Sequence, residues 1–190
     1  MADPVLRRTP PPGAQGATWS MCQPFSAYSL RANLRDAQDV LAAAALEPIS
    51  HPLLSLSLQP CRALTEGEWT ALWLGPDEQL LIGPDPQGPA MAQRLGVAMR
   101  SLPHALVDVS HRQCAVELRG PLAAAMLNTG CPLDLELESA PVGFCTRTVF
   151  SKAEIVLWRR TESIFQLQTW RSFVPYVTGL LALAAEEHGH

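Results

Sequence analysis

An acid and an imidazole lie three positions apart in the segment Asp108-Val-Ser-His111. A carboxylate beside an imidazole can act as a general base, because the carboxylate orients the ring and stabilises its charged form. The segment also follows a short apolar run, and a carboxylate at the end of a strand commonly accepts hydrogen bonds from turn amides. No nucleophile lies nearby for the pair to activate. The pattern therefore favours a turn carboxylate over a catalytic dyad.

The other histidines and the cysteines lack the spacing of a metal or redox site. His51 precedes a proline, His104 follows one, and neither has a second ligand at metal spacing. His188 and His190 lie at the end of the chain, where a solvated tail is the simpler interpretation. The cysteines are Cys22, Cys61, Cys114, Cys131 and Cys145. They form no Cys-x-x-Cys pair, and an odd number is typical of reduced thiols.

Motifs that hold nucleotides, flavins or catalytic metals are missing from the sequence. It has no Gly-x-Gly-x-x-Gly after a strand, no Walker loop and no His-Glu-x-x-His. We therefore assign no catalytic, cofactor-binding or metal-binding residue, and expect any flavin or nicotinamide to bind to another chain. Stacking or interface groups could come from Trp69, Trp73, Trp158 and Trp170 with Arg159, Arg160 and Arg171. We expect at least two of these tryptophans in the core and the arginines at partner-facing or solvated positions.

Composition limits the class of protein. A chain of 190 residues is long enough for one domain with a core, and its 47% apolar and 17% charged residues favour a chain that packs against a partner. A net charge of -4 without a basic run argues against binding to nucleic acid or to anionic lipid. Neither a secretory leader nor a run of 18 apolar residues is recognisable, which predicts a cytoplasmic protein that does not span a membrane.

The pattern along the chain predicts an arm followed by one domain. Residues 1–20 are rich in proline and glycine, and we expect a flexible arm there, with a single domain over residues 21–190. Apolar periodicity and turn residues then predict a helix at 30–46, a strand at 54–58 where leucine alternates with serine, a hairpin at 70–82 and a helix at 91–100.

The stretch from residue 105 to 133 contains the most closely specified elements. Strands are predicted at 105–109 and 114–118, followed by a helix at 122–128. Gly120 is expected at the helix N-cap ahead of Pro121, and Gly130 is expected in left-handed conformation where the helix ends. Strands at 145–150, 154–158 and 165–169, and a helix that begins near Ser172 and frays from Ala185, complete the chain. The whole pattern predicts an α+β fold, mostly an antiparallel sheet with helices packed on it.

Several of these segments resemble one known group of proteins. The sequence Asp-Val-Ser-His, an alternating strand and then Gly-Pro-x-Ala-x-x-Met-Leu is similar to the aminomethyltransferase family, which has the folate-binding fold of the glycine-cleavage T-protein. The segments at 74–80, 130–135 and 170–176 further resemble the gamma subunits of heterotetrameric sarcosine oxidases. They read Leu-Gly-Pro-Asp-Glu-Gln-Leu, Gly-Cys-Pro-Leu-Asp-Leu and Trp-Arg-Ser-Phe-Val-Pro-Tyr.

This resemblance implies a function for the whole assembly. It implies a non-catalytic subunit that supports oxidative demethylation of sarcosine to glycine, with formation of hydrogen peroxide and 5,10-methylenetetrahydrofolate. It also implies alpha, beta and delta partner subunits, and it places FAD, FMN, NAD and tetrahydrofolate on those other chains. The same residues leave open the corresponding subunit of a related N-methyl amino acid oxidase or dehydrogenase, and a stand-alone folate-dependent one-carbon transferase.

Two departures from the related proteins argue against the transferase. The aminomethyltransferases begin one strand with two aspartates, one of which polarises folate, whereas this chain has Ala153 and Glu154 there. The extra methylene of a glutamate displaces the carboxylate by roughly an ångström, which typically costs about a hundredfold in rate. The chain is also about half as long as a full aminomethyltransferase. Gly143-Phe-Cys145 resembles the iron–sulfur maintenance branch of the fold only at its glycine and cysteine, so we expect a buried strand cysteine.

Overall fold

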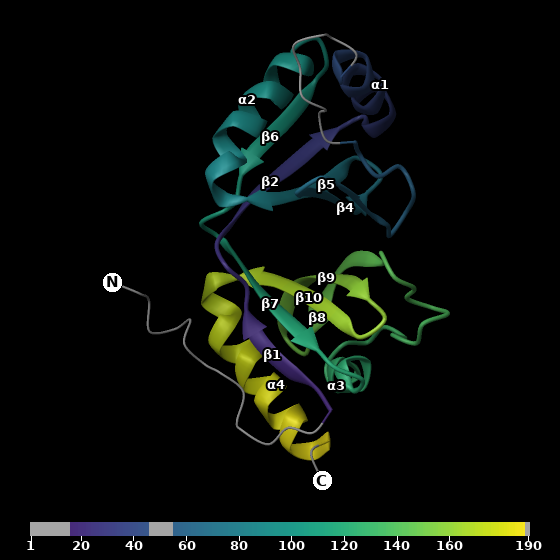
Figure 1. Cartoon of the computed structure of the whole chain (residues 1–190), viewed down its shortest axis with the longest axis vertical. Coiled ribbons are helices and arrows are strands. Elements are labelled where there is room, and N and C mark those ends of the chain that lie inside the picture. Colours follow the sequence, from purple (N-terminus) through teal and green to yellow (C-terminus); the bar gives the residue numbers. More distant parts are fainter. Residues whose placement is uncertain (1–15, 46–54, 189–190) are drawn as a thin grey trace. The chain divides into compact units, whose positions relative to one another are not determined.

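The computed structural model describes residues 16–45 and 55–188 (Figure 1). They form two compact units, which we name by their strands. In the described residues, the β2–β6 unit comprises 24–45 and 55–111, and the β7–β10 unit comprises 16–23 and 112–188. All strand pairs in the described residues are antiparallel, and the helices pack on the sheets. The predicted α+β class is confirmed.

The β2–β6 unit contains a five-stranded sheet with the order β3-β4-β5-β2-β6. Its strands are β2 (Phe25–Ala32), β3 (Ala63–Glu66), β4 (Trp69–Gly75), β5 (Glu78–Pro84) and β6 (His104–Asp108). Its helices are α1 (Leu34–Ala45) and α2 (Gly88–Ala98), with the short 3-10 turn η2 (Asp85–Gln87) ahead of α2. The predicted hairpin is the β4–β5 pair, which turns at residues 75–78.

Helices and sheet share one apolar core in this unit. The sheet contributes Tyr28 and Leu30 from β2 and Leu81 from β5. These side chains pack in one buried cluster with Leu41 of α1 and Leu95 of α2. The helical period predicted at 30–46 is therefore correct from Leu34 onward, whereas residues 30–32 belong to β2. Residue 46, the end of that prediction, lies outside the described residues.

The strand predicted at 54–58 is wrong for residues 55–58, which have no regular structure. Side chains, rather than a neighbouring strand, bind the backbone of this segment. The amide of Ser55 donates to Glu66, that of Leu56 to Gln38 and that of Ser57 to Gln79. Gln79 also donates from its own amide to the Ser57 carbonyl, so a fully buried glutamine imitates a strand partner. Residue 54 lies outside the described residues.

The β7–β10 unit contains the second sheet, with the order β1-β7-β10-β9-β8. Its strands are β1 (Thr18–Met21), β7 (Gln113–Arg119), β8 (Cys145–Phe150), β9 (Ala153–Thr161) and β10 (Ile164–Trp170). Its helices are α3 (Ala123–Asn128) and α4 (Val174–His188), with the 3-10 turn η3 (Arg171–Phe173) ahead of α4. The three-strand meander predicted after residue 145 is confirmed as β8, β9 and β10.

One face of this sheet carries the core of the β7–β10 unit. Val116 of β7 and Leu167 of β10 lie opposite each other and pack with Leu127 of α3 and Leu181 of α4. The helix α4 extends to His188, and Ala185 is buried in the core. The predicted fraying from Ala185 is therefore wrong for residues 185–188, because the helix continues through them and Ala185 still packs in the core.

The predicted arm at residues 1–20 ends too late. Residues 1–15 lie outside the described residues, but Thr18–Met21 form β1, and Thr18 pairs with Arg119. Trp19 explains this, because its side chain is buried in the core of the β7–β10 unit. Burial of one large aromatic side chain supplies the apolar stabilisation that the composition of the arm does not suggest.

Both glycine roles predicted around α3 are corrected. Leu122 rather than Gly120 occupies the N-cap. Gly120 has φ +137, and a Cβ there would lie 2.3 Å from the carbonyl oxygen of Gly16. Gly130 does not adopt a positive φ; instead, a Cβ at this position would lie 2.8 Å from the ring of Phe150. Close approach of neighbouring chain, rather than helix termination, explains this second glycine.

Candidate functional site

Asp108 and Ser110 form a hydrogen-bonded turn at the end of β6. The Asp108 carboxylate accepts from the Ser110 amide at 2.9 Å and from the Ser110 hydroxyl at 2.6 Å. The Ser110 hydroxyl oxygen in turn accepts from the buried amide of Ala27 at 2.9 Å, and the amide of Val109 donates to the carbonyl of Ala27. The motif thus joins the end of β6 to the neighbouring strand β2.

The electrostatics of this turn fit a structural role for Asp108. The hydroxyl and amide of Ser110 lower the pKa of the Asp108 carboxyl, and His111 contributes less. His111 itself is exposed. The prediction of a turn carboxylate is consistent with this geometry, because the hydrogen-bond partner of the carboxylate is a serine in its own turn.

Ala153 and Glu154 begin β9, but they face different surroundings. Ala153 is fully buried in the core of the β7–β10 unit and lies opposite Phe150. Glu154 lies opposite Val149, and its side chain is 53% exposed, with one carboxylate oxygen 3.9 Å from Nε of Arg147. A position inside an apolar core cannot accommodate an ionised carboxylate without a partner. The two positions therefore do not form a pair of acids that converge on one ligand.

Arg159 is the main polar residue that sequence reasoning misplaced. Arg159 is only 4% exposed, so its side chain is neither partner-facing nor solvated. The guanidinium donates to the carbonyls of Leu135 at 3.0 Å, Ala140 at 2.5 Å and Glu162 at 2.9 Å, and lies 4.6 Å from the Phe165 ring centroid. Burial lowers the pKa of Arg159. The alternation of side chains along β9 could have revealed the buried position of Arg159, because Ile155, Leu157 and Arg159 share one face of the strand.

Two of the three carbonyl partners of Arg159, Leu135 and Ala140, belong to the segment between α3 and β8, whereas Glu162 lies in the turn after β9. We call residues 131–144 the Arg159 loop (Figure 1, green segment before β8). Asp134 gives it a second internal support, because its carboxylate accepts from the Glu136 amide at 2.9 Å and from the Ser139 hydroxyl at 2.6 Å. Those two hydrogen bonds lower the pKa of the Asp134 carboxyl, which keeps it ionised.

The predictions for tryptophans and cysteines are largely confirmed. Trp69 is buried and Trp73 packs against the core of the β2–β6 unit, whereas Trp170 is 41% exposed. Arg160 and Arg171 are exposed, as expected. Cys145 is a fully buried strand residue, and the five cysteines, all of which lie in the described part of the chain, form no disulfide. Burial raises the pKa of Cys22 to about 11, so this thiol stays protonated at neutral pH.

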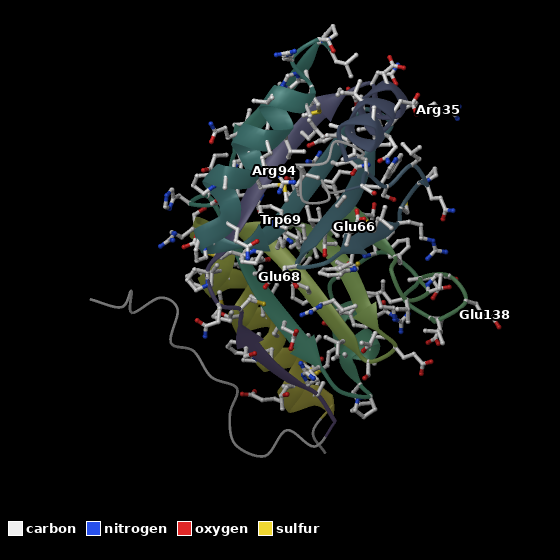
Figure 2. All side chains as sticks on the ribbon, turned by 45° about the horizontal axis from the view of Figure 1, so that its top comes forward. Arg35, Glu66, Glu68, Trp69, Arg94 and Glu138 are labelled. Carbon is white, nitrogen blue, oxygen red and sulfur yellow. The ribbon has the colours of Figure 1, made fainter. Side chains whose placement is uncertain are left out.

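Ligand-binding features in the described residues are sparse. No group of three or more metal-binding side chains occurs in the part of the chain that the structure describes. Nδ1 of His104 lies 2.9 Å from the carbonyl of Leu102, whereas His51 and His190 lie outside the described residues. A surface pocket of about 240 Å³ adjoins the start of α1. Its lining residues are Asn33, Leu34, Arg35, Leu58, Pro60, Trp73 and Pro76. Figure 2 shows Arg35, one of these residues, at the outer edge of the β2–β6 unit.

The helices of the described chain are too short or too polar to cross a lipid bilayer.

Comparison with known proteins places this geometry in a family. The chain is 33% identical over 116 residues to a sarcosine oxidase subunit gamma from Corynebacterium sp. strain P-1, which covers 61% of this chain and 56% of the relative. The chain therefore spans about half the length of the curated relatives it matches.

Solved structures match over most of the described fold. A chain of the heterotetrameric sarcosine oxidase from Corynebacterium sp. U-96, in complex with pyrrole 2-carboxylate, superposes with a TM-score of 0.81 and 26% identity, covering 94% of this chain and 88% of that one. The glycine cleavage system aminomethyltransferase T from Bartonella henselae superposes with a TM-score of 0.61 and 14% identity, covering 90% of this chain and 49% of that one. The second likeness concerns the fold alone.

A family model described as the sarcosine oxidase, gamma subunit family matches residues 35–187. That range includes the β6 turn, the β9 alanine–glutamate pair and the Arg159 loop. The chain belongs to the sarcosine oxidase gamma subunit family.

Proposed function

We propose that this chain is a non-catalytic subunit of a heteromeric sarcosine oxidase. The assembly would oxidise sarcosine to glycine and form hydrogen peroxide, and pass the one-carbon unit to tetrahydrofolate as 5,10-methylenetetrahydrofolate. The chain itself would pack against the subunits that carry the chemistry. Family membership and the match to a chain of a heterotetrameric sarcosine oxidase support this role.

The single observation that carries the non-catalytic assignment is the beginning of β9. Folate-dependent transferases of the related fold have two aspartates at the corresponding strand, whereas Ala153 is fully buried here and Glu154 extends to solvent beside Arg147. Electrostatic stabilisation of a developing charge requires a group held at the reacting atoms. These residues do not fit a folate that is bound in the way the transferases bind it.

The proposal assigns cofactors and partners to the rest of the assembly. FAD, FMN, NAD and tetrahydrofolate would bind to the other subunits, which we expect to be an alpha, a beta and a delta chain in the cytoplasm. This chain contributes no glycine-rich phosphate loop of its own. The exact N-methyl amino acid would be selected by another subunit.

The test is purification of the affinity-tagged full-length chain from extracts of its own cells. We expect it to copurify with two larger chains and one smaller chain, identified by mass spectrometry, with flavin absorbance and with peroxide production when sarcosine is added. A colourless protein that purifies alone and binds tetrahydrofolate would contradict the proposal and favour a stand-alone one-carbon transferase. Peroxide production from another N-methyl amino acid, but not from sarcosine, would contradict the substrate.

A further inference from the structure

The Arg159 loop is held in one conformation by contacts that do not involve its outer surface. Arg159 binds the backbone carbonyls of Leu135 and Ala140, and both of those residues are fully buried. The Asp134 carboxylate binds Glu136 and Ser139, and the Ala140 amide donates to the Glu136 carbonyl at 2.8 Å. These bonds fix the backbone on both sides of Leu137.

The outer surface of the loop is apolar at its centre and acidic around it. Leu137 is 42% exposed and Val142 is 50% exposed, although neither position contributes to the core. Glu136 and Glu138 flank Leu137 and are exposed. Figure 2 shows Glu138 on this loop with its side chain pointing away from the strands. The Arg159 loop thus presents a leucine between two carboxylates.

We propose that the Arg159 loop is a docking element that inserts Leu137 into an apolar pocket of another subunit, with lysine or arginine side chains at the rim of that pocket. The inference rests on the proposed function, because it takes the partner to be a subunit of the same oxidase. A loop that is already ordered loses little conformational entropy on binding, so its contacts contribute more of their energy to affinity.

The charges on the loop select this occupant over others. Anionic lipid or nucleic acid would meet Asp134, Glu136 and Glu138 with like charge. A second copy of the chain that docked through the same loop would place these acids opposite each other, since a two-fold interface pairs identical surfaces. A basic rim around an apolar pocket complements both features of the loop, and opposite charges at a rim also accelerate association.

The test measures binding of the full-length chain to the remaining oxidase subunits, prepared together and immobilised. Leu137→Asp should weaken binding about tenfold or more, because it places a carboxylate in an apolar pocket. The control is Leu183→Asp, the same substitution at a 58% exposed leucine on α4, which should bind like wild type. Circular dichroism melts of both variants check that each is folded.

The charge complementarity has its own pair of variants. Glu136→Gln with Glu138→Gln should lower the association rate several-fold at low ionic strength and make binding less sensitive to salt. Glu186→Gln with Glu187→Gln changes the net charge equally on exposed residues of α4, and should leave the rate within about twofold.

The outcomes separate the two proposals. If the wild-type chain does not bind the other subunits, both the proposed function and the docking element are wrong. If wild type binds and Leu137→Asp binds equally well, or Leu183→Asp is equally impaired, the function stands and the docking element is wrong. If Leu137→Asp weakens binding as expected, but Glu136→Gln with Glu138→Gln associates as fast as its control on α4, the docking element stands and the proposed basic rim of the pocket is wrong.

Discussion

The guanidinium of Arg159 donates a hydrogen bond to the carbonyl oxygen of Leu135, 24 residues earlier in the chain, at 3.0 Å. A buried cation is unfavourable unless its donors are satisfied, and here backbone carbonyls rather than an acid satisfy them. Strand β9 and the Arg159 loop therefore depend on each other. The side chain fixes the loop, and the loop solvates the side chain.

Arg159→Met should lower the free energy of unfolding by about 2 to 5 kcal/mol, because it leaves the buried carbonyls of Leu135 and Ala140 without their donor. Urea denaturation measures this loss, and hydrogen exchange should report increased opening of the Arg159 loop. The control Arg119→Met removes an arginine whose side chain is 60% exposed, and should cost less than about 1 kcal/mol. Equal losses from the two substitutions would contradict the structural role of Arg159.

Ser110→Ala should lower the free energy of unfolding by about 1 to 3 kcal/mol. The substitution removes the hydroxyl to which the amide of Ala27 donates, and Ala27 is fully buried, so that amide loses its acceptor. Ser101→Ala, at an exposed serine, should change stability by less than about 0.5 kcal/mol. Thermal and urea unfolding distinguish the two, and a neutral Ser110→Ala would mean that the turn does not need its hydroxyl.

Stability should fall with acid in part through Asp108. The folded-state pKa of Asp108 is lowered by Ser110, so its contribution is complete above the unfolded value of about 3.9 and is lost as the pH falls through the lower folded value. Asp108→Asn should therefore lose less stability than wild type between about pH 6 and pH 3. Parallel pH profiles for the two proteins would rule out this contribution.

Gly130→Ala and Gly96→Ala should have opposite effects. A Cβ on Gly130 would lie 2.8 Å from the fully buried Phe150 ring, so the substitution should cost about 1 to 3 kcal/mol. Gly96 lies within α2, where an added Cβ would meet no atom within 4 Å beyond its chain neighbours and the nearby backbone of its own helix, so alanine should stabilise by about 0.5 to 1 kcal/mol. Differential scanning calorimetry would show one melting temperature decreased and the other increased.

Ala153→Asp should destabilise the chain by several kcal/mol, because it places a carboxylate in the core opposite Phe150. Glu154→Asp, at the exposed neighbouring position, should change stability by less than about 0.5 kcal/mol. Chemical denaturation at neutral pH is the measurement. A well-folded Ala153→Asp protein of wild-type stability would mean that this position can hold an acid after all.

Sequence periodicity predicted the elements whose partners are close in the chain. The β4–β5 hairpin, the β8–β10 meander and helix α2 all carry their own turn residues and apolar spacing. Strands β6 and β7 were also predicted from their own apolar pattern, although their partners β2, β1 and β10 are distant in the chain. Other segments with distant partners were missed or misjudged. The segment at residues 55–58 alternates like a strand, but its amides bind side chains from α1, β3 and β5, which no local pattern encodes.

The same distinction separates the predicted and missed parts of the candidate site. Asp108 and Ser110 are two residues apart, so their turn could be inferred from local chemistry alone. Arg159 binds carbonyls 19 and 24 residues away, and backbone carbonyls have no identity in a sequence. Its inward alternation on β9 was the one available signal.

The pairing of Thr18 with Arg119 has a consequence for synthesis on the ribosome. Strand β1 emerges early, but β7, its partner, emerges only after every residue of the β2–β6 unit has been translated. Because that unit is one continuous stretch of chain, it can fold while β1 still lacks its sheet. We expect a nascent chain arrested after the β2–β6 unit has left the ribosome, but while β7 is still inside it, to protect residues 24–45 and 55–111 from protease and to leave Trp19 accessible.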